Sequence, residues 1–274
     1  MPKGSKKKEE TMNNNESLKE KLNTLQTLAA DALVLRGQTK GEHDGNFLKM
    51  IFHGKKWKDT DLMLKVEMLA KIYSVARTTG TKKDKKKNEY LKENLKNLLD
   101  NNEHHTTDLF NSYKTNYEIS EELGKILLDK SCGSREKNGE TNTIISLLSK
   151  YGYYITNFQF PIYDNFARKG ITALFKQDEF KALFKEWKKS HQQIELKKEL
   201  TFFYKYSALL NKCSGLPKTQ RIDSLDAFFW LYGIMQSTQS TNLANKTFWW
   251  SGTCGYVGDD RFQKWYRDAK KLMS

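Results

Sequence analysis

Apolar residues recur at helical spacing along most of this 274-residue chain, and this periodicity limits the fold more than any other feature of the sequence. The clearest run passes through Leu18, Leu22, Leu25 and Leu28. Segments that alternate apolar and polar residues are rare, so few strands are expected. The sequence therefore predicts a mainly α fold. Helices are expected at about residues 17–33, 61–73, 109–117, 119–128, 143–151, 164–175, 178–187, 194–210, 223–235 and 262–273.

The composition of the chain divides it into a short tail and one helical region. Residues 1–16 contain runs of Lys, Glu and Asn with almost no apolar side chains, so we expect a disordered basic tail there. Residues 17–274 are expected to form a helical domain. The turn formers at residues 131–140 suggest two lobes within it, at about 17–130 and 131–274.

The charge of the chain indicates a polyanionic partner. Its 47 Lys and Arg residues outnumber 33 Asp and Glu residues, for a net charge of +14. Such a balance favours phosphate contacts with release of counterions, so double-stranded DNA is the leading partner. No apolar run is long enough to cross a membrane, and no signal peptide is evident. We therefore expect a cytoplasmic protein without a membrane partner, associated with the nucleoid if the protein is bacterial.

Metal and cofactor chemistry have little support in the sequence. Cys132, Cys213 and Cys254 are far apart and odd in number, so reduced thiols are expected. The adjacent pair His104 and His105 would point in different directions on a helix and is expected to be exposed. The glycine-rich patterns that bind nucleoside phosphates are absent. No metal and no cofactor are therefore expected.

The aromatic segment at residues 149–171 contains the strongest local signal for function. Pro161 cannot continue a helix and restricts the residue before it, so one helix should end and another should begin near Asp164. A carboxylate at a helix start can simply cap backbone N–H groups, or it can act in catalysis. Lys150, in turn, can be a solvated lysine at a helix end or a reactive amine.

The order of residues in this segment resembles a known family. Lys150, then Phe160-Pro161-Ile162-Tyr163-Asp164, then Arg168 and Lys169 are similar to the signature of helix-hairpin-helix DNA glycosylases. The Ser149-Lys150 pair, the Pro-Ile-Tyr-Asp turn and the later Asp226-Ala-Phe-Phe-Trp230-Leu-Tyr-Gly233 element are most similar to 8-oxoguanine-glycosylase-like proteins. The matches are scattered over about residues 60–235. The resemblance implies two helical lobes that flank a cleft.

The resemblance also implies an activity and a set of site residues. The activity is excision of a damaged or modified base that is flipped into an aromatic pocket, with oxidised guanine as the implied substrate class. Asp164 would stabilise the positive charge that develops on the sugar. Lys150 would form a Schiff base and add lyase activity. Substrate and DNA contacts are expected from Tyr163, Arg168, Lys169, Trp249 and Trp250.

Other interpretations of the sequence remain open at this point. A hypermodified base of invading phage DNA is an alternative substrate, which would place the protein in antiviral defence rather than repair. Arg168 and Lys169 can belong to a solvated helix face, and Trp249 and Trp250 can form a buried cluster. A protein that binds nucleic acid without catalysis, or a defence-associated protein with an RNA or protein partner, would also be basic and helical.

Overall fold

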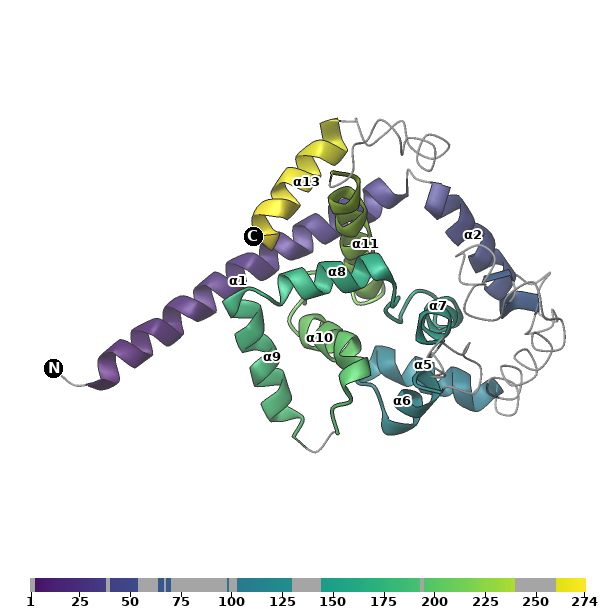
Figure 1. The fold of residues 1–274 in the computed structure, drawn as a ribbon, viewed down its shortest axis with the longest axis horizontal. Coiled ribbons are helices and arrows are strands. Elements are labelled where there is room, and N and C mark those ends of the chain that lie inside the picture. Colours follow the sequence, from purple (N-terminus) through teal and green to yellow (C-terminus); the bar gives the residue numbers. More distant parts are fainter. Residues whose placement is uncertain are drawn as a thin grey trace, which may run out of the picture. The chain divides into compact units, whose positions relative to one another are not determined.

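The computed structural model describes residues 3–37, 40–53, 64–66, 68–69, 98, 103–129, 144–192, 195–239 and 260–274. Within these ranges every regular element is a helix, which confirms the expected mainly α fold (Figure 1). The elements are α1 (Lys3–Arg36), α2 (Lys40–His53), α5 (Glu103–Asn116), α6 (Glu121–Leu127), α7 (Ile145–Ile155), α8 (Asn165–Leu174), α9 (Asp178–Ser190), the short 3-10 helix η3 (Lys198–Leu200), α10 (Thr201–Leu210), α11 (Arg221–Gln239) and α13 (Asp260–Met273).

The chain forms two compact units. Unit 1 contains residues 1–40 and 165–274, and unit 2 contains residues 41–164. Unit 2 is therefore an insertion in the sequence of unit 1, and the units do not divide near residue 130 as the sequence suggested. The boundary between the units lies between Asp164 and Asn165, within the segment of greatest functional interest.

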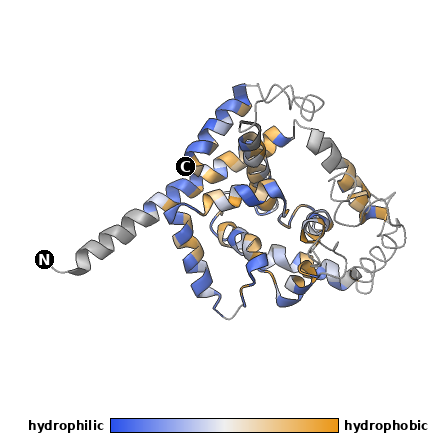
Figure 2. Cartoon of the chain, in the orientation of Figure 1, coloured by the Kyte–Doolittle hydropathy of each residue, from blue (hydrophilic) through white to orange (hydrophobic). Residues whose placement is uncertain are grey.

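Helix α11 forms the centre of unit 1, where it packs against α1, α8 and α13. Every residue from Ile222 to Met235 is buried except Trp230, which is half-exposed. The C-terminal helix is joined to α1 by the indole N–H of Trp265, which donates to the carbonyl of Leu28 at 2.8 Å. In Figure 2 the helices α9 and α13 carry apolar residues on one side and hydrophilic residues on the other, as expected for helices at a surface.

Two glycines allow α8 and α11 to approach closely. A Cβ atom on Gly170 of α8 would lie 2.9 Å from the ring of Phe229 on α11. A Cβ atom on Gly233 of α11 would lie 2.8 Å from the backbone oxygen of Phe166 on α8. Each helix thus places a phenylalanine against a glycine of the other. This arrangement fixes the position of α8, which begins directly after Asp164.

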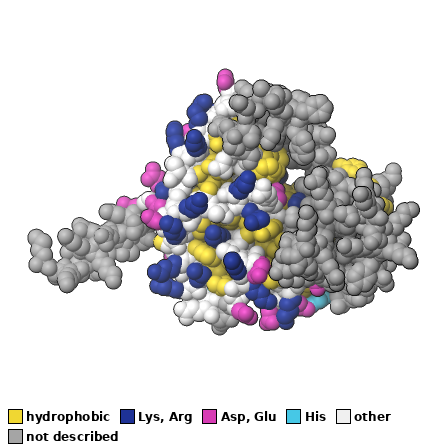
Figure 3. All heavy atoms as spheres, viewed as in Figure 1, with side chains coloured by type: hydrophobic (Ala, Val, Ile, Leu, Met, Phe, Trp, Pro, Cys, Tyr) yellow, Lys and Arg dark blue, Asp and Glu magenta, His cyan; other side chains and the backbone are white. Residues whose placement is uncertain are grey.

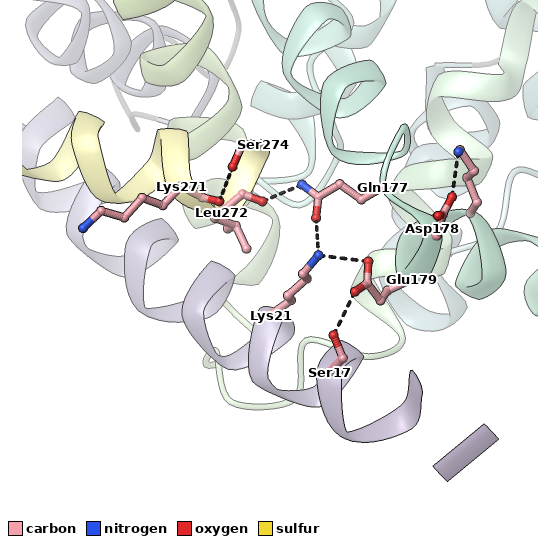
Figure 4. Close-up of polar contacts among 9 residues, drawn as sticks. Ser17, Lys21, Gln177, Asp178, Glu179, Lys271, Leu272 and Ser274 are labelled. Carbon is pink, nitrogen blue, oxygen red and sulfur yellow. Dashed lines mark hydrogen bonds and ion pairs between the residues drawn. The ribbon is translucent and has the colours of Figure 1, made fainter. Parts of the chain in front are cut away.

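A polar cluster joins α1, the start of α9 and the end of α13 (Figure 4). The ammonium group of Lys21 donates to Gln177 Oε1 and to Glu179 Oε2, both at 2.9 Å. Ser17 donates to the other oxygen of Glu179 at 2.8 Å. The side-chain amide of Gln177 donates to the carbonyl of Leu272. These hydrogen bonds connect the N-terminal and C-terminal helices of unit 1 through α9.

Unit 2 is built around aromatic rings from α5 and from the segment that follows α7. The ring of Phe160 packs edge-on against Phe110 and Tyr113, with centroid distances of 4.9 and 5.0 Å. Gly152 on α7 leaves room for these rings, because a Cβ atom there would collide with Phe110 and lie 3.0 Å from Phe160. The segment that leads to Asp164 is therefore fixed by its own buried side chains.

The structure differs from the sequence-based expectations at three places in its N-terminal part. Helix α1 already begins at Lys3, whereas residues 1–16 were expected to be disordered. Helix α2 was not expected, although it buries Leu48 and Ile51. Of the expected helix at 61–73, residues 64–66 and 68–69 are helical and the others lie outside the described residues.

Among the helices that the structure describes, none is both long enough and apolar enough to cross a bilayer.

Candidate functional site

Lys150 lies inside unit 2. It sits in the middle of α7 with only 3% of its surface exposed. Its ammonium group donates to the hydroxyl of Ser146 at 2.9 Å, one turn earlier on the same helix. Lys150 is therefore not the solvated lysine at a helix end that was one interpretation of the sequence. A lysine is rarely this buried unless its ammonium group has a polar partner, which Ser146 supplies here.

The turn after α7 has an unusual backbone. Asn157 and Phe158 follow each other in the left-handed region, with φ values of 55° and 69°. The hydroxyl of Thr156 accepts a hydrogen bond from the N–H of Gln159, and the ring of Phe158 stacks on Tyr153 at a centroid distance of 4.8 Å. A left-handed conformation is costly for a bulky residue and persists only where surrounding contacts hold it. The turn is thus a fixed connection between α7 and the Pro-Ile-Tyr-Asp segment.

Ser149 connects this segment back to α7. Its hydroxyl accepts a hydrogen bond from the backbone N–H of Tyr163 at 2.9 Å and donates to the carbonyl of Ser146 at 3.1 Å. Ser149 is fully buried. Because Ser149 precedes Lys150 and Tyr163 precedes Asp164, this hydrogen bond brings the two halves of the sequence signature together within unit 2. Ser149 stands beside Lys150 in the sequence signature, where its residue type alone indicated no role.

Asp164 and Tyr163 are both half-buried at the end of unit 2. Asp164 occupies the position immediately before α8, close to where the sequence predicted a helix start. Arg168 and Lys169 are exposed on α8, in unit 1. The structure thus places five of the seven predicted site residues. Trp249 and Trp250 lie outside the described residues.

Most aromatic side chains around the motif belong to the core. Tyr151, Tyr153, Tyr154 and Phe160 are buried, and their rings contact one another or their neighbours in unit 2. Phe158, Tyr163 and Phe166 are the aromatic residues of segment 149–171 that are partly exposed. Of these, Phe158 and Tyr163 lie in unit 2 with Lys150 and Asp164.

The element from Asp226 to Gly233 organises unit 1. Asp223 and Asp226 face Arg36 at the end of α1, with shortest nitrogen–oxygen distances of 2.7 and 3.9 Å. Gly233 holds the first turn of α8 through Phe166, as described above. The acidic and glycine positions of this element thus have structural functions. Trp230 of this element is half-exposed, whereas Phe229 and Leu231 beside it are buried.

Metal binding and thiol chemistry find no site in the described ranges. No cluster of three His, Cys, Asp or Glu side chains in these ranges could hold a metal ion. Cys213 is fully buried, and burial raises the pKa of its thiol to about 12 although Arg221 acts in the opposite direction. His105, one of the adjacent pair, contacts Glu122 at the surface at 2.7 Å.

Comparison with known proteins gives no relative: no family model matches the sequence, and no curated protein or solved structure matches the chain.

Proposed function

We propose that this protein is a DNA glycosylase that removes a damaged or modified base. The main support is the hydrogen bond between Ser149 and Tyr163, because it joins the segment that carries Lys150 to the segment that carries Asp164. A buried lysine and a half-buried carboxylate on two connected, well-packed segments are suited to chemistry at a sugar. The basic composition of the chain fits a DNA substrate.

Asp164 is the proposed electrostatic catalyst. Cleavage of an N-glycosidic bond builds positive charge on the deoxyribose, and a fixed carboxylate lowers the energy of that transition state. Within unit 2 its backbone is held close by, because Ser149 accepts a hydrogen bond from the N–H of Tyr163, one residue earlier. The carboxylate can also orient the water that attacks the sugar in a monofunctional reaction.

Lys150 is the proposed nucleophile for a lyase step. Its amine would attack C1′ as the base leaves, and the resulting Schiff base would permit strand cleavage. Only a neutral amine has the lone pair for this attack, and burial in general disfavours the ammonium form of lysine. Exposed lysines of the chain lack that environment.

The substrate base must leave the DNA stack to reach these groups. Tyr163 and Phe158 are the proposed aromatic contacts in this segment, since both are partly exposed. Oxidised guanine is the first substrate class to test, followed by hypermodified bases of phage DNA. Arg168 and Lys169 on α8 are proposed to bind the phosphates beside the flipped nucleotide.

The decisive experiment incubates the protein with duplexes that contain different modified bases, followed by alkali to cleave abasic sites. Wild-type protein should release at least one base. Asp164→Asn should reduce the rate by at least about 100-fold, as for loss of a preorganised electrostatic catalyst. Asp178→Asn is the matched control, because Asp178 is an exposed carboxylate in the first turn of α9. Equal rates for wild type and Asp164→Asn would exclude Asp164 from catalysis.

Borohydride reduction tests the lysine separately. A covalent protein–DNA adduct should form with wild-type protein and be absent with Lys150→Gln. The control variant Lys185→Gln, which replaces an exposed lysine of α9, should still form the adduct. Because Lys150 is buried, peptide mapping of the wild-type adduct provides a test that does not depend on the variant's folding. An adduct at another residue would remove Lys150 from the mechanism. Salt-dependent binding without product across the whole panel would favour the alternative of a non-catalytic DNA-binding protein.

A further inference from the structure

The exposed face of α8 consists only of cationic and hydrogen-bonding side chains. Asn165, Arg168, Lys169 and Thr172 are all exposed, and the chain has no Asp or Glu from Asn165 to Gln177. At about 100° per residue these four side chains fall on one side of the helix. The opposite side of α8 is buried, with Gly170 against Phe229. The helix therefore presents an acid-free surface from a fixed position.

Lys176 continues this face beyond the last residue of α8. The N–H of Phe175 donates to the carbonyl of Ile171, and the N–H of Lys176 donates to that of Ala173, both at 3.1 Å. The backbone thus keeps its helical course for one more turn, and exposed Lys176 falls on the same side as Thr172. From Asn165 to Lys176 the face measures about 16 Å at 1.5 Å per residue.

Lys205 adds a cation from the neighbouring helix. Helix α10 packs against α8, and the ammonium group of Lys205 lies 5.3 Å from the ring centroid of Phe175, the residue before Lys176. Lys205 is half-buried, and this burial lowers its pKa. Neither Lys176 nor Lys205 forms an ion pair with an acidic residue in the described part of the chain.

The lysines of α9 have a different environment. Lys181 forms an ion pair with Asp178 at 2.8 Å, and Lys189 follows Glu186 by three residues on the same helix. The positive potential of these two lysines is therefore partly cancelled by neighbouring carboxylates.

Figure 3 shows Lys and Arg side chains separated by apolar ones on the face of unit 1 around α8. The arrangement around α8 and Lys205 is thus not a general property of every exposed helix in unit 1.

We propose that Thr172, Lys176 and Lys205 extend the contact of Arg168 and Lys169 into a continuous binding surface for one strand of the DNA phosphate backbone. This inference rests on the proposed function for its choice of DNA as the partner. One strand carries a phosphate for about every 3.4 Å of helix axis, so a face of about 16 Å can follow four to five phosphates. The half-buried amine of Lys205 is suited to a phosphate, because ion pairing then offsets its desolvation.

The test measures binding of wild-type protein to an unmodified 20-base-pair duplex by fluorescence anisotropy at several salt concentrations. In Lys176→Gln/Lys205→Gln, the slope of log K against log[salt] should become shallower by about 1.8, or about 0.9 for each lost phosphate contact. The control Lys181→Gln/Lys189→Gln removes the same charge from α9 and should leave the slope within about 0.5 of the wild-type value. Lys205→Arg keeps the charge and should keep the wild-type slope.

The proposed DNA-binding surface would be contradicted by an unchanged slope in Lys176→Gln/Lys205→Gln, or by an equal change of slope in the α9 control. It would also be contradicted if wild-type protein did not bind the duplex, or if it bound an RNA duplex of the same sequence more tightly. If Lys205→Gln impairs folding, exposed Lys176→Glu alone should still reduce the slope by about 1. If no base is released in the glycosylase assay but the salt slope still changes as expected, the proposed enzymatic activity is rejected. The proposed DNA-binding surface is then still supported.

Discussion

The backbone N–H of Tyr163 donates a 2.9 Å hydrogen bond to the hydroxyl of Ser149, fourteen residues earlier in the chain. This contact is internal to unit 2 and is buried on the Ser149 side. It connects α7 to the turn that ends at Asp164. The relative placement of the two proposed catalytic side chains therefore depends on a serine that takes no part in the chemistry.

Replacing Ser149 with Ala should weaken both stability and the proposed activity. The amide of Tyr163 would lose its acceptor in a partly buried position, which costs about 1–3 kcal/mol of unfolding free energy. Urea unfolding measures this loss, and base release measures the activity. Ser149→Thr keeps the hydroxyl and should recover more activity than stability, because its extra methyl group must fit a packed site. Equal activity in Ser149→Ala and wild type would show that the hydrogen bond does not position the site.

The contact between α8 and α11 should tolerate no added methyl group. In Gly233→Ala the new Cβ would approach backbone atoms of Phe166 to 2.8–2.9 Å, so the helices must separate. In Gly170→Ala the nearest atom is a ring carbon of Phe229 at 2.9 Å, which is also buried. Each change should cost about 1–3 kcal/mol of unfolding free energy, as in other overpacked cores. Gly233→Ala should cost more, because backbone cannot rotate away as a ring can.

Thermal unfolding is the measurement for both glycine variants, and Thr172→Ala on the exposed face of α8 is the control. That control should change the unfolding free energy by no more than about 0.5 kcal/mol. A neutral Gly233→Ala would contradict the close crossing of α8 and α11.

Acidification should remove the contribution of Glu179 to the unfolding free energy. Hydrogen bonding from Lys21, assisted by Ser17, lowers the pKa of Glu179 below its ordinary value of 4.5 despite some burial. Stability from a lowered carboxyl pKa is present above the unfolded-state pKa and disappears as the pH falls through the folded-state pKa. The difference in unfolding free energy between wild type and Glu179→Gln should thus be constant above about pH 5.5 and shrink below pH 4.5.

The size of that difference should be about 0.5 kcal/mol, because the pair is partly exposed and screened by solvent. Denaturant titrations at pH 3.5, 5.5 and 7 measure this difference. The control variant Asp178→Asn shows how much the loss of an exposed carboxylate next to Glu179 changes the unfolding free energy. A difference that grows on acidification would contradict the hydrogen bonds in Figure 4.

Cys213 should be inert in the folded protein. Its thiol is fully buried with a pKa raised to about 12, so very little thiolate exists at neutral pH. Iodoacetamide followed by peptide mapping should label Cys213 at least about 100-fold more slowly in native protein than in urea. Peptide mapping distinguishes Cys213 from Cys132 and Cys254. Rapid native labelling would show that the end of α10 opens readily.

The sequence predicted most helices of unit 1 because their apolar residues keep helical spacing. It did not predict α2, since Leu48 and Ile51 are too few to give a periodic signal. It placed the start of the first helix near Ser17, whereas α1 begins at Lys3, because a formed helix can extend through polar residues at little cost. Apolar content alone does not reveal such an extension.

The candidate site was predictable as residue types but not as an arrangement. Pro161 fixed a helix start near Asp164, as the structure has it at Asn165. The burial of Lys150 and the role of Ser149 depend on how α7 packs in unit 2, which no local pattern records. The glycine contacts between α8 and α11 likewise require knowledge of which helices cross.

Two residues of unit 1 that flank its interruption in the sequence contact the same helix, α11. The chain departs after Arg36, which contacts Asp223 on α11, and it returns at Phe166, which contacts Gly233 on α11. Ten residues of helix separate these positions, or about 15 Å. Helix α11 therefore holds both points at which the sequence of unit 1 is interrupted. The packing of unit 1 around the basic α8 surface thus depends on contacts that unit 1 makes within itself.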